Sequence, residues 1–225
     1  MHSVFLALAA TLTYPTVNGH ELILPLENVS SINADFDQRR GYKRTHGAID
    51  QNVRIGTAVR AVAAGEVTNV YSMFSYMRET NRILKKIRRS RTTSWRLAKN
   101  RMRQCNCTWR IRRKSRGAWK SGVYITVEHI SDKGKIFKSQ YMHLSKVYVK
   151  IGSKVKQGDV IAKSGDTAII DSNPHLHFQI KYKGIKQNPK RYIRQLDGKI
   201  TTILKKFYNK FFRFLSPTYS TLHWR

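Results

Sequence analysis

Short runs of β-branched and apolar residues, separated by Gly, Asn and Asp, dominate two long stretches of the chain, 23–71 and 123–192. The run Val123-Tyr124-Ile125-Thr126-Val127 is one example. β-Branched and aromatic residues fit the pleated surface of a strand, whereas Gly, Asn and Asp favour turns. Neither stretch contains the helical patterns of about 10 to 15 residues that would link parallel strands. The pattern therefore predicts a mainly β domain over residues 23–197, built from short antiparallel strands.

The segment between the two stretches, residues 72–121, has a different composition, with 17 Lys or Arg residues and one acid, Glu79. In its first part, apolar side chains recur at a loosely helical spacing: Ile83, Leu84, Ile87, Trp95, Ala98 and Met102. Residues 109–112, Trp-Arg-Ile-Arg, alternate instead like a strand. The segment is predicted to be a basic insertion in the β domain, either a helical hairpin or a long, partly disordered loop.

Two terminal segments fall outside the predicted domain. The stretch from Val4 to Leu12 has the length of the apolar region of a secretory signal, but no Lys or Arg precedes it. Residues 1–22 are therefore either an export signal or an N-terminal part of the folded chain. Residues 198–225 form a basic, aromatic tail, which we expect to dock on the β domain as an amphipathic helix or to contact another surface.

The charge of the chain is unusual, because 43 Lys and Arg residues against 13 Asp and Glu residues give a formal net charge of +30. A field of this sign attracts polyanions, so nucleic acid, anionic lipid and acidic wall polymers are all candidate partners. Cys105 and Cys107 are too close in sequence for an easy disulfide or a four-ligand zinc site. The cysteines therefore do not reveal the redox compartment.

Candidate chemistry gathers around the histidines. His46 and Asp50 lie four residues apart around Gly47, a spacing that a turn can bring onto one ion, and imidazole with carboxylate is a normal zinc ligand set. Taken alone, this pair is a weak signal. In His175-Leu176-His177, a strand would place both imidazoles on one face, about 6 to 7 Å apart. Such a pair can supply one metal ligand and one group that acts beside the metal.

His143 lies in Tyr141-Met142-His143-Leu144-Ser145 and, by itself, is read as a structural histidine. The other histidines suggest a catalytic role for it. Zinc with three protein ligands keeps a fourth position for water, and hydrolysis then needs a base and a group that stabilises the oxyanion. His143 and one histidine of the His-Leu-His pair meet that need.

Taken together, these motifs resemble peptidase family M23, the lysostaphin type of zinc metallopeptidase. The resemblance covers about residues 26–192 without the basic insertion. It implies that His46, Asp50 and His177 bind one Zn²⁺ ion per chain. It further implies that His175 is the general base towards the attacking water and that His143 stabilises the tetrahedral intermediate.

The resemblance also implies a fold, a substrate and a location. The fold would be an open antiparallel β-sheet curled around a groove, with zinc at the groove floor and loops as walls. The substrate would be a cross-link or stem peptide of bacterial peptidoglycan, and the enzyme would act in the bacterial cell envelope, in the periplasm or outside the cell.

The basic insertion would be a flexible arm that holds the enzyme near an anionic envelope polymer or lipid, or a solvated loop with no partner.

The sequence departs from the family pattern at four positions. Gly47 directly follows the first histidine, Ala168 and Asn173 replace expected glycines, and Gln179 stands where an acid is common. None of these changes removes a ligand, so the expected activity stays, while the shape of the substrate loops is left open.

Two other functions compete with the peptidase. A catalytically silent module that binds the cell wall or activates another hydrolase would share the fold, but related domains of that kind have lost ligands that this chain keeps. A basic nucleic-acid-binding protein would use the arginines with Trp95, Trp109 and Trp119 to contact phosphates and stack on bases. That function explains the charge but not the five His and Asp positions.

Overall fold

The computed structural model describes residues 14–27, 32–39, 45–87, 89–115 and 117–193. Residues 1–13 of the predicted N-terminal segment and the predicted tail, 198–225, lie outside the described residues. The strands are β1 (Thr16–Val17), β2 (His20–Glu21), β3 (Ile32–Ala34), β4 (Ile49–Asn52), β5 (Ala58–Arg60), β6 (Gly65–Tyr71), β7 (Val123–Ile130), β8 (Ile136–Val147), β9 (Lys154–Val155), β10 (Val160–Ser164), β11 (His175–Tyr182) and β12 (Ile185–Gln187). The helices are α2 (Met73–Lys86), α3 (Trp95–Gln104), α4 (Thr108–Lys114), α5 (Gly117–Lys120) and the short 3₁₀ turn η1 (Pro189–Arg191).

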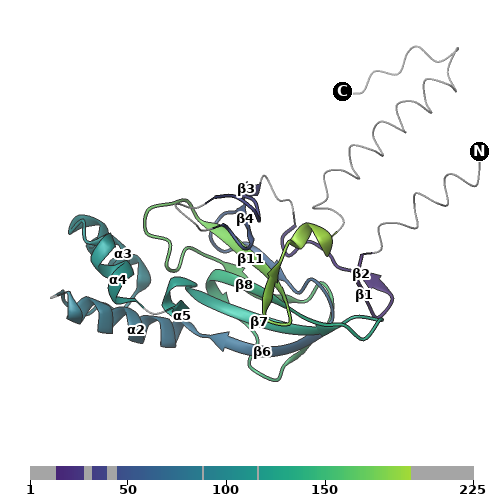
Figure 1. The fold of residues 1–225 in the computed structure, drawn as a ribbon. Coiled ribbons are helices and arrows are strands. Elements are labelled where there is room, and N and C mark those ends of the chain that lie inside the picture. The colour runs from purple at the N-terminus through teal and green to yellow at the C-terminus, as the bar shows by residue number, and fades with distance from the viewer. Residues whose placement is uncertain (1–13, 28–31, 40–44, 88, 116, 194–225) are drawn as a thin grey trace, which may run out of the picture.

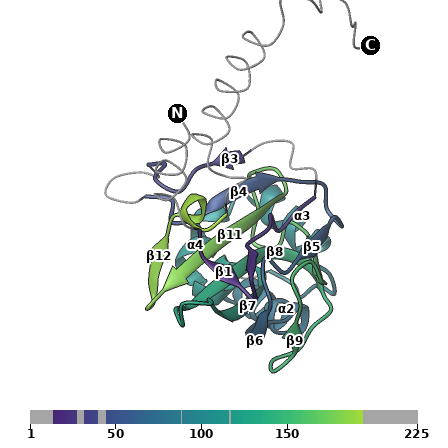
Figure 2. The ribbon, with the colours of Figure 1, turned by 90° about the vertical axis from the view of Figure 1, so that its right-hand side faces the viewer.

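Ten of these strands form one sheet, and β1 and β2 form a separate hairpin (Figures 1 and 2). The main path through the sheet is β3-β4-β11-β8-β7-β6-β9, with β10 between β5 and β8, and β12 beside β11. All of the strand pairs among the described residues are antiparallel. The structure therefore confirms the predicted mainly β, open antiparallel sheet.

The two faces of the central strand β11 have different characters. Leu176, Phe178 and Ile180 point into the hydrophobic core. Because side chains alternate along a strand, His175 and His177 project from the opposite face. The alternation predicted from the His-Leu-His motif therefore places both imidazoles on one side of the sheet.

The basic insertion is helical from α2 to α5, and it packs at one end of the sheet (Figure 1). Ser72 and Ser94 cap α2 and α3, since their side chains accept hydrogen bonds from the backbone N–H groups of Ser75 and Leu97. The structure thus decides between the two predicted forms of this segment. Most of the described residues of the insertion are in helices, as the helical alternative predicted.

One local prediction in the insertion is wrong. Residues 109–112 belong to α4 and not to a strand. Four alternating residues are too few to separate a period of two from a period of 3.6. The buried residues decide the outcome, because Cys107 and Ile111 are four positions apart and both join the core, as one face of a helix requires.

Three aromatic rings anchor the insertion. Tyr76 of α2 stacks on Trp119 of α5 with 5.6 Å between ring centroids, and Trp95 of α3 packs edge-on against both. The indole Nε1 of Trp119 donates to Thr80 Oγ1 at 2.8 Å. This aromatic core is buried, whereas many of the cations lie on the outside, including Arg78, Lys85, Arg96 and Lys114.

The insertion leaves and rejoins the sheet at neighbouring points. Tyr71 at the end of β6 pairs in register with Tyr124 near the start of β7, and the two rings stack with centroids 5.7 Å apart. Residues 72–122 therefore form one long connection between two adjacent strands.

Cys105 and Cys107 form a disulfide, contrary to the expectation from their spacing. Asn106 between them has a positive φ of 45°, which reverses the chain and brings the two Cα atoms to 5.2 Å. That separation is normal for a disulfide. None of the helices in the described ranges is long and apolar enough to cross a membrane.

Candidate metal centre and active-site groove

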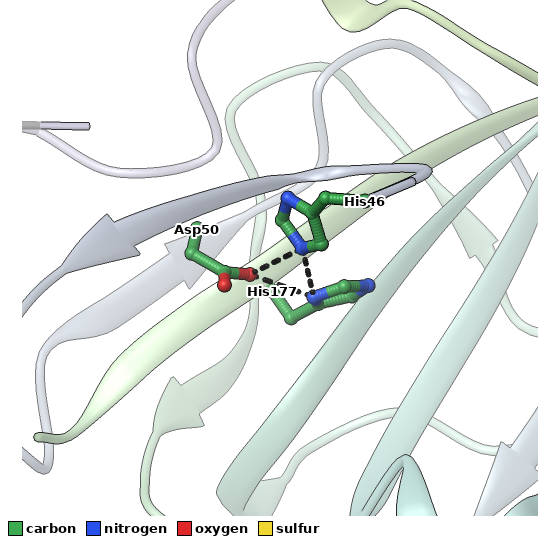
Figure 3. Close-up of side chains that lie close together, drawn as sticks. All are labelled: His46, Asp50 and His177. Carbon is green, nitrogen blue, oxygen red and sulfur yellow. Dashed lines mark hydrogen bonds and ion pairs between the residues drawn. The ribbon is translucent and has the colours of Figure 1, made fainter. Parts of the chain in front are cut away.

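Three of the predicted site residues meet on the face of the sheet opposite the hydrophobic core, and Figure 3 shows their side chains close together. Asp50 of β4 pairs in register with His177 of β11. His46 lies four residues before Asp50, in the segment leading into β4. Asp50 Oδ1 lies 2.6 Å from His177 Nδ1 and 3.2 Å from His46 Nε2. The two ring nitrogens are 3.2 Å apart. One strand pair therefore brings together residues that are far apart in sequence.

The chemistry of this group fits a bound cation. Two imidazole nitrogens and a carboxylate oxygen, all within 4.8 Å of one another, form a donor set that zinc prefers. The other ring nitrogen of His46, Nδ1, lies 3.0 Å from the carbonyl oxygen of Asp35. A carbonyl only accepts, so Nδ1 carries the proton and Nε2 presents its lone pair to the cluster. Such a support for a ligand histidine is typical of metal sites.

The charge state of Asp50 also suits a ligand. Burial alone would raise the pKa of this carboxyl, but the polar contacts with the ring nitrogens of His177 and His46 outweigh it and hold the pKa well below the usual range. Burial lowers the pKa of His177, although Asp50 acts in the opposite direction. A deprotonated carboxylate between neutral imidazoles is the state in which such groups bind metal.

His143 and His175 stand beside this cluster. Their ring centroids are 5.0 Å apart, and the ring of His143 lies 5.8 Å from that of His177. His143 Nδ1 lies 2.7 Å from the Thr167 carbonyl oxygen, and His175 Nδ1 lies 2.8 Å from the Asn173 carbonyl oxygen. Both rings therefore keep the proton on Nδ1 and leave Nε2 free for chemistry. All five predicted residues are brought together.

The backbone at His143 adopts a conformation that is uncommon for a residue other than glycine. Its φ of 64° places a non-glycine residue in the left-handed region. The conformation is held by its neighbours, since the His143 N–H donates to the Ser121 carbonyl at 3.2 Å. Burial, followed by the charges of His177 and His175, lowers the pKa of His143 to about 3. The ring is therefore neutral in this environment at neutral pH.

A pocket of about 420 Å³ opens beside these histidines. Its floor includes His143, His175 and His177, and its walls include residues 168–172 and Lys120 from the end of the insertion. Ala168, one of the replaced glycines, adopts a positive φ of 64°. The backbone thus keeps the left-handed turn that glycine would favour, even though the side chain adds strain there.

The insertion holds this pocket wall, which the sequence did not reveal. Lys99 Nζ lies 2.6 Å from Asp166 Oδ2, and Trp95 Nε1 donates to Asp166 at 3.0 Å. Arg103 Nε donates to the Ile170 carbonyl at 2.8 Å, and the Ala168 N–H donates to the Tyr76 hydroxyl at 2.7 Å. These contacts surround Thr167, whose carbonyl orients His143. The sequence hints at these contacts only through the aromatic and basic residues of the insertion, and it does not predict which residues they contact.

Gln179, the other notable departure, lies on the groove face two residues after His177. Its Nε2 donates to Gln140 Oε1 at 3.3 Å, and Gln140 Nε2 donates to Thr126 Oγ1 at 3.0 Å. A row of neutral polar groups therefore crosses β11, β8 and β7 next to the metal cluster. An acid at this position would make a different contact with Gln140.

Comparison with known proteins places the part of the chain that carries His143, His175 and His177 in a family. The profile of peptidase family M23 matches residues 111–189. Lipoprotein NlpD of Yersinia enterocolitica is 38% identical over 74 residues, which cover 33% of this chain and 70% of that protein. Peptidoglycan DD-endopeptidase ShyA of Vibrio cholerae is 38% identical over 64 residues, 28% of this chain and 14% of that protein.

Several curated relatives are much longer than the matched region. For ShyA and two uncharacterized metalloproteases, the match spans only 14–17% of the relative's own length. Among solved structures, lysostaphin from Staphylococcus simulans aligns with a TM-score of 0.49 at 23% sequence identity, covering 78% of this chain and 55% of that chain.

Proposed function

The chain belongs to peptidase family M23, and on that premise we propose that it is a zinc-dependent endopeptidase acting on peptide cross-links or stem peptides of bacterial peptidoglycan. The observation that carries the proposal is the convergence of His46, Asp50 and His177, with His143 and His175 facing the same pocket. The relative ShyA, a peptidoglycan DD-endopeptidase, supports the substrate class.

In this proposal His46, Asp50 and His177 hold the zinc ion. Bound zinc would supply Lewis acidity for the scissile carbonyl and for the attacking water. His175 accepts the water proton at Nε2, the ring nitrogen left free when Nδ1 donates to the Asn173 carbonyl oxygen at 2.8 Å. His175 then passes the proton to the leaving amine.

His143 is assigned to the tetrahedral intermediate. The Thr167 carbonyl keeps a proton on Nδ1, so Nε2 donates only when the ring carries a second proton. The negative charge that develops on the substrate oxygen raises the pKa of the ring, so that Nε2 takes up a proton from solvent. The role of His143 is then to donate from Nε2 to that oxygen.

The outer face of the insertion supports a second element of the proposal. Its exposed cations, such as Arg78 and Lys85, are suited to contact an anionic polymer or lipid of the cell envelope, where peptidoglycan lies. This contact would weaken as salt screens the charges. Nucleic acid is disfavoured as the partner, because Trp95 and Trp119 are buried in the aromatic core and are not free to stack on bases.

The proposal is tested by zinc content and by release of new amino termini from purified peptidoglycan. We expect about one zinc per chain in the wild type, as a three-ligand site requires. His177→Ala should lose zinc and activity, whereas His143→Ala should keep zinc and lose activity. His20→Ala, which changes an exposed histidine of the β2 hairpin, is the control and should change neither.

Two outcomes would reject the peptidase. A folded wild type that binds no zinc would remove the metal site. A wild type that binds zinc and sediments with peptidoglycan, yet releases no amino termini, would instead be a catalytically silent wall-binding or activator module.

A further inference from the structure

Three lysines lie side by side on the sheet face that carries the metal cluster. Lys181 of β11 pairs in register with Lys138 of β8 on one side and with Lys186 of β12 on the other. Directly paired residues project from the same face of a sheet. Lys181 follows His177 by four positions on the same strand, so it projects from the same face as that ligand, about 13 Å away.

This arrangement places like charges opposite one another, which destabilises a sheet. Lys138 is partly neutralised by Glu128, whose Oε2 lies 3.0 Å away. For Lys181 and Lys186, the described part of the chain offers no ion pair. Burial lowers the pKa of Lys181, and the charges of Lys186 and Lys138 lower it further. The row therefore carries more positive charge than its own surroundings balance.

Lys186 extends from the row towards the metal cluster. A Cβ atom on residue 47 would overlap the Cδ atom of Lys186 and would lie 2.9 Å from its Nζ. The lysine stem therefore lies across Gly47, directly beside the ligand His46. This explains physically why glycine is suited to the position where the family pattern differs.

The space between the row and the metal cluster is polar but uncharged. Gln179 lies midway on β11, and its amide is bonded to Gln140. A peptide lying on this face would pass from the histidines over the partly exposed Gln140 to the lysines. An extended chain covers about 13 Å in roughly four residues.

We propose that Lys138, Lys181 and Lys186 form a subsite that binds a carboxylate of the substrate peptide, roughly four residues from the bond that is cut. The proposal deepens the proposed function and rests on it, because it fixes the substrate as an acidic peptide. A carboxylate would relieve the repulsion in the row and would form charge-assisted hydrogen bonds with the ammonium groups.

The test measures binding separately from cleavage. The probe is a fluorescein-labelled pentapeptide with neutral residues and one terminal glutamate, compared with the same peptide carrying glutamine. Binding is followed by fluorescence anisotropy with the full chain carrying His143→Ala, which prevents turnover. We expect the glutamate peptide to bind about tenfold more tightly, as one charge-assisted contact implies.

Two variants locate the effect. Lys181→Met and Lys186→Met, each added to His143→Ala, should remove most of the preference for glutamate. The matched control is Lys163→Met, which deletes an exposed lysine of β10 and should leave the preference unchanged. Circular dichroism and the melting temperature confirm that each variant is folded.

Equal affinity for the two peptides, or a preference that survives Lys181→Met and Lys186→Met, would overturn the subsite. A third peptide with phosphoserine tests the ligand class, and a phosphoserine peptide that binds more tightly than the glutamate peptide would overturn the assignment to a carboxylate. Failure of the proposed function looks different, since the glutamate preference would be present while the wild type cleaves no peptide. Equal cleavage of both peptides would leave the peptidase standing and remove the subsite.

Discussion

Replacement of Lys99 by Met tests whether the insertion holds the pocket wall. The Lys99 ammonium lies 2.6 Å from the Asp166 carboxylate, and the two side chains are only 10% and 18% exposed. Met keeps the length of the lysine stem and removes the charge. Asp166 would keep Trp95 Nε1 as a donor at 3.0 Å, so the carboxylate loses its ion pair but keeps one hydrogen bond.

The expected loss follows from the burial of this pair. An exposed ion pair is worth about 0 to 1 kcal/mol, whereas removal of one partner of a buried pair costs about 3 to 5 kcal/mol. Because the Lys99 pair is mostly buried and the Trp95 hydrogen bond remains, we expect Lys99→Met to lower the free energy of unfolding by about 2 kcal/mol. For a chain of this size, that loss lowers the melting temperature by about 4 to 8 °C.

Urea unfolding of the full chain measures this loss, and hydrogen exchange measures where it acts. Exchange should accelerate in residues 166–170 as well as in α3. Arg96→Met is the matched control, because it removes an exposed cation from the same helix, and it should stay within about 0.5 kcal/mol of the wild type.

A double-mutant cycle with Asp166→Asn isolates the interaction between the two side chains. The reasoning is refuted if Lys99→Met is as stable as Arg96→Met, or if the cycle gives a coupling energy near zero. In either case the insertion would not support the wall through this ion pair.

Three further predictions concern pH, backbone geometry and metal. Burial, the largest effect, lowers the pKa of His129 from 6.5 to about 4, so the unfolded chain binds more protons than the folded chain below pH 6.5. The free energy of unfolding should therefore fall by about 3 kcal/mol from pH 7 to pH 4. His129→Asn should flatten this part of the urea-derived pH profile, and an unchanged profile would count against the assignment. Gly122→Ala should destabilise the fold and lower kcat, because its Cβ would lie 2.5 Å from the Thr167 carbonyl oxygen that orients His143. Gly134→Ala is the control, because Gly134 has a similar positive φ but open space around its Cβ position. Equal effects in the two variants would contradict this explanation. Removal of metal by a chelator should lower the melting temperature, and zinc at about a thousandfold excess over its Kd should restore about 4 kcal/mol, whereas a melting temperature that ignores both treatments would argue against a metal site in the folded chain.

The sequence predicted the elements of the site because its motifs are short and lie on strands. A His-x-His on a strand has one geometric outcome, and β4 pairs with β11 so that Asp50 meets His177. The role of each histidine came from the resemblance to the family, and those roles stay predictions for the experiments above. His129 lies outside these motifs and is buried, with its ring nitrogens in contact with the Ala64 carbonyl oxygen and the Ser139 hydroxyl.

The insertion was predictable only in part. Its helical spacing was visible in residues such as Ile83 and Ala98, which are buried. Its attachment to residues 166–170 was not visible, since contacts between segments about 70 residues apart leave no local period. The lysine row was also hidden, because it exists only once the registers of β8, β11 and β12 are known.

The adjacent exit and entry of the insertion, at Tyr71 and Tyr124, have a consequence for the order of folding. Closing a flexible 52-residue loop instead of a two-residue turn adds about 3 kcal/mol of chain entropy to the first contact between β6 and β7. Helices form within microseconds from local contacts, and a preformed α2–α5 unit shortens the loop that remains to be closed. The central hairpin would then nucleate after the helices. Substitutions that loosen the aromatic core should slow refolding even where the final sheet is unchanged.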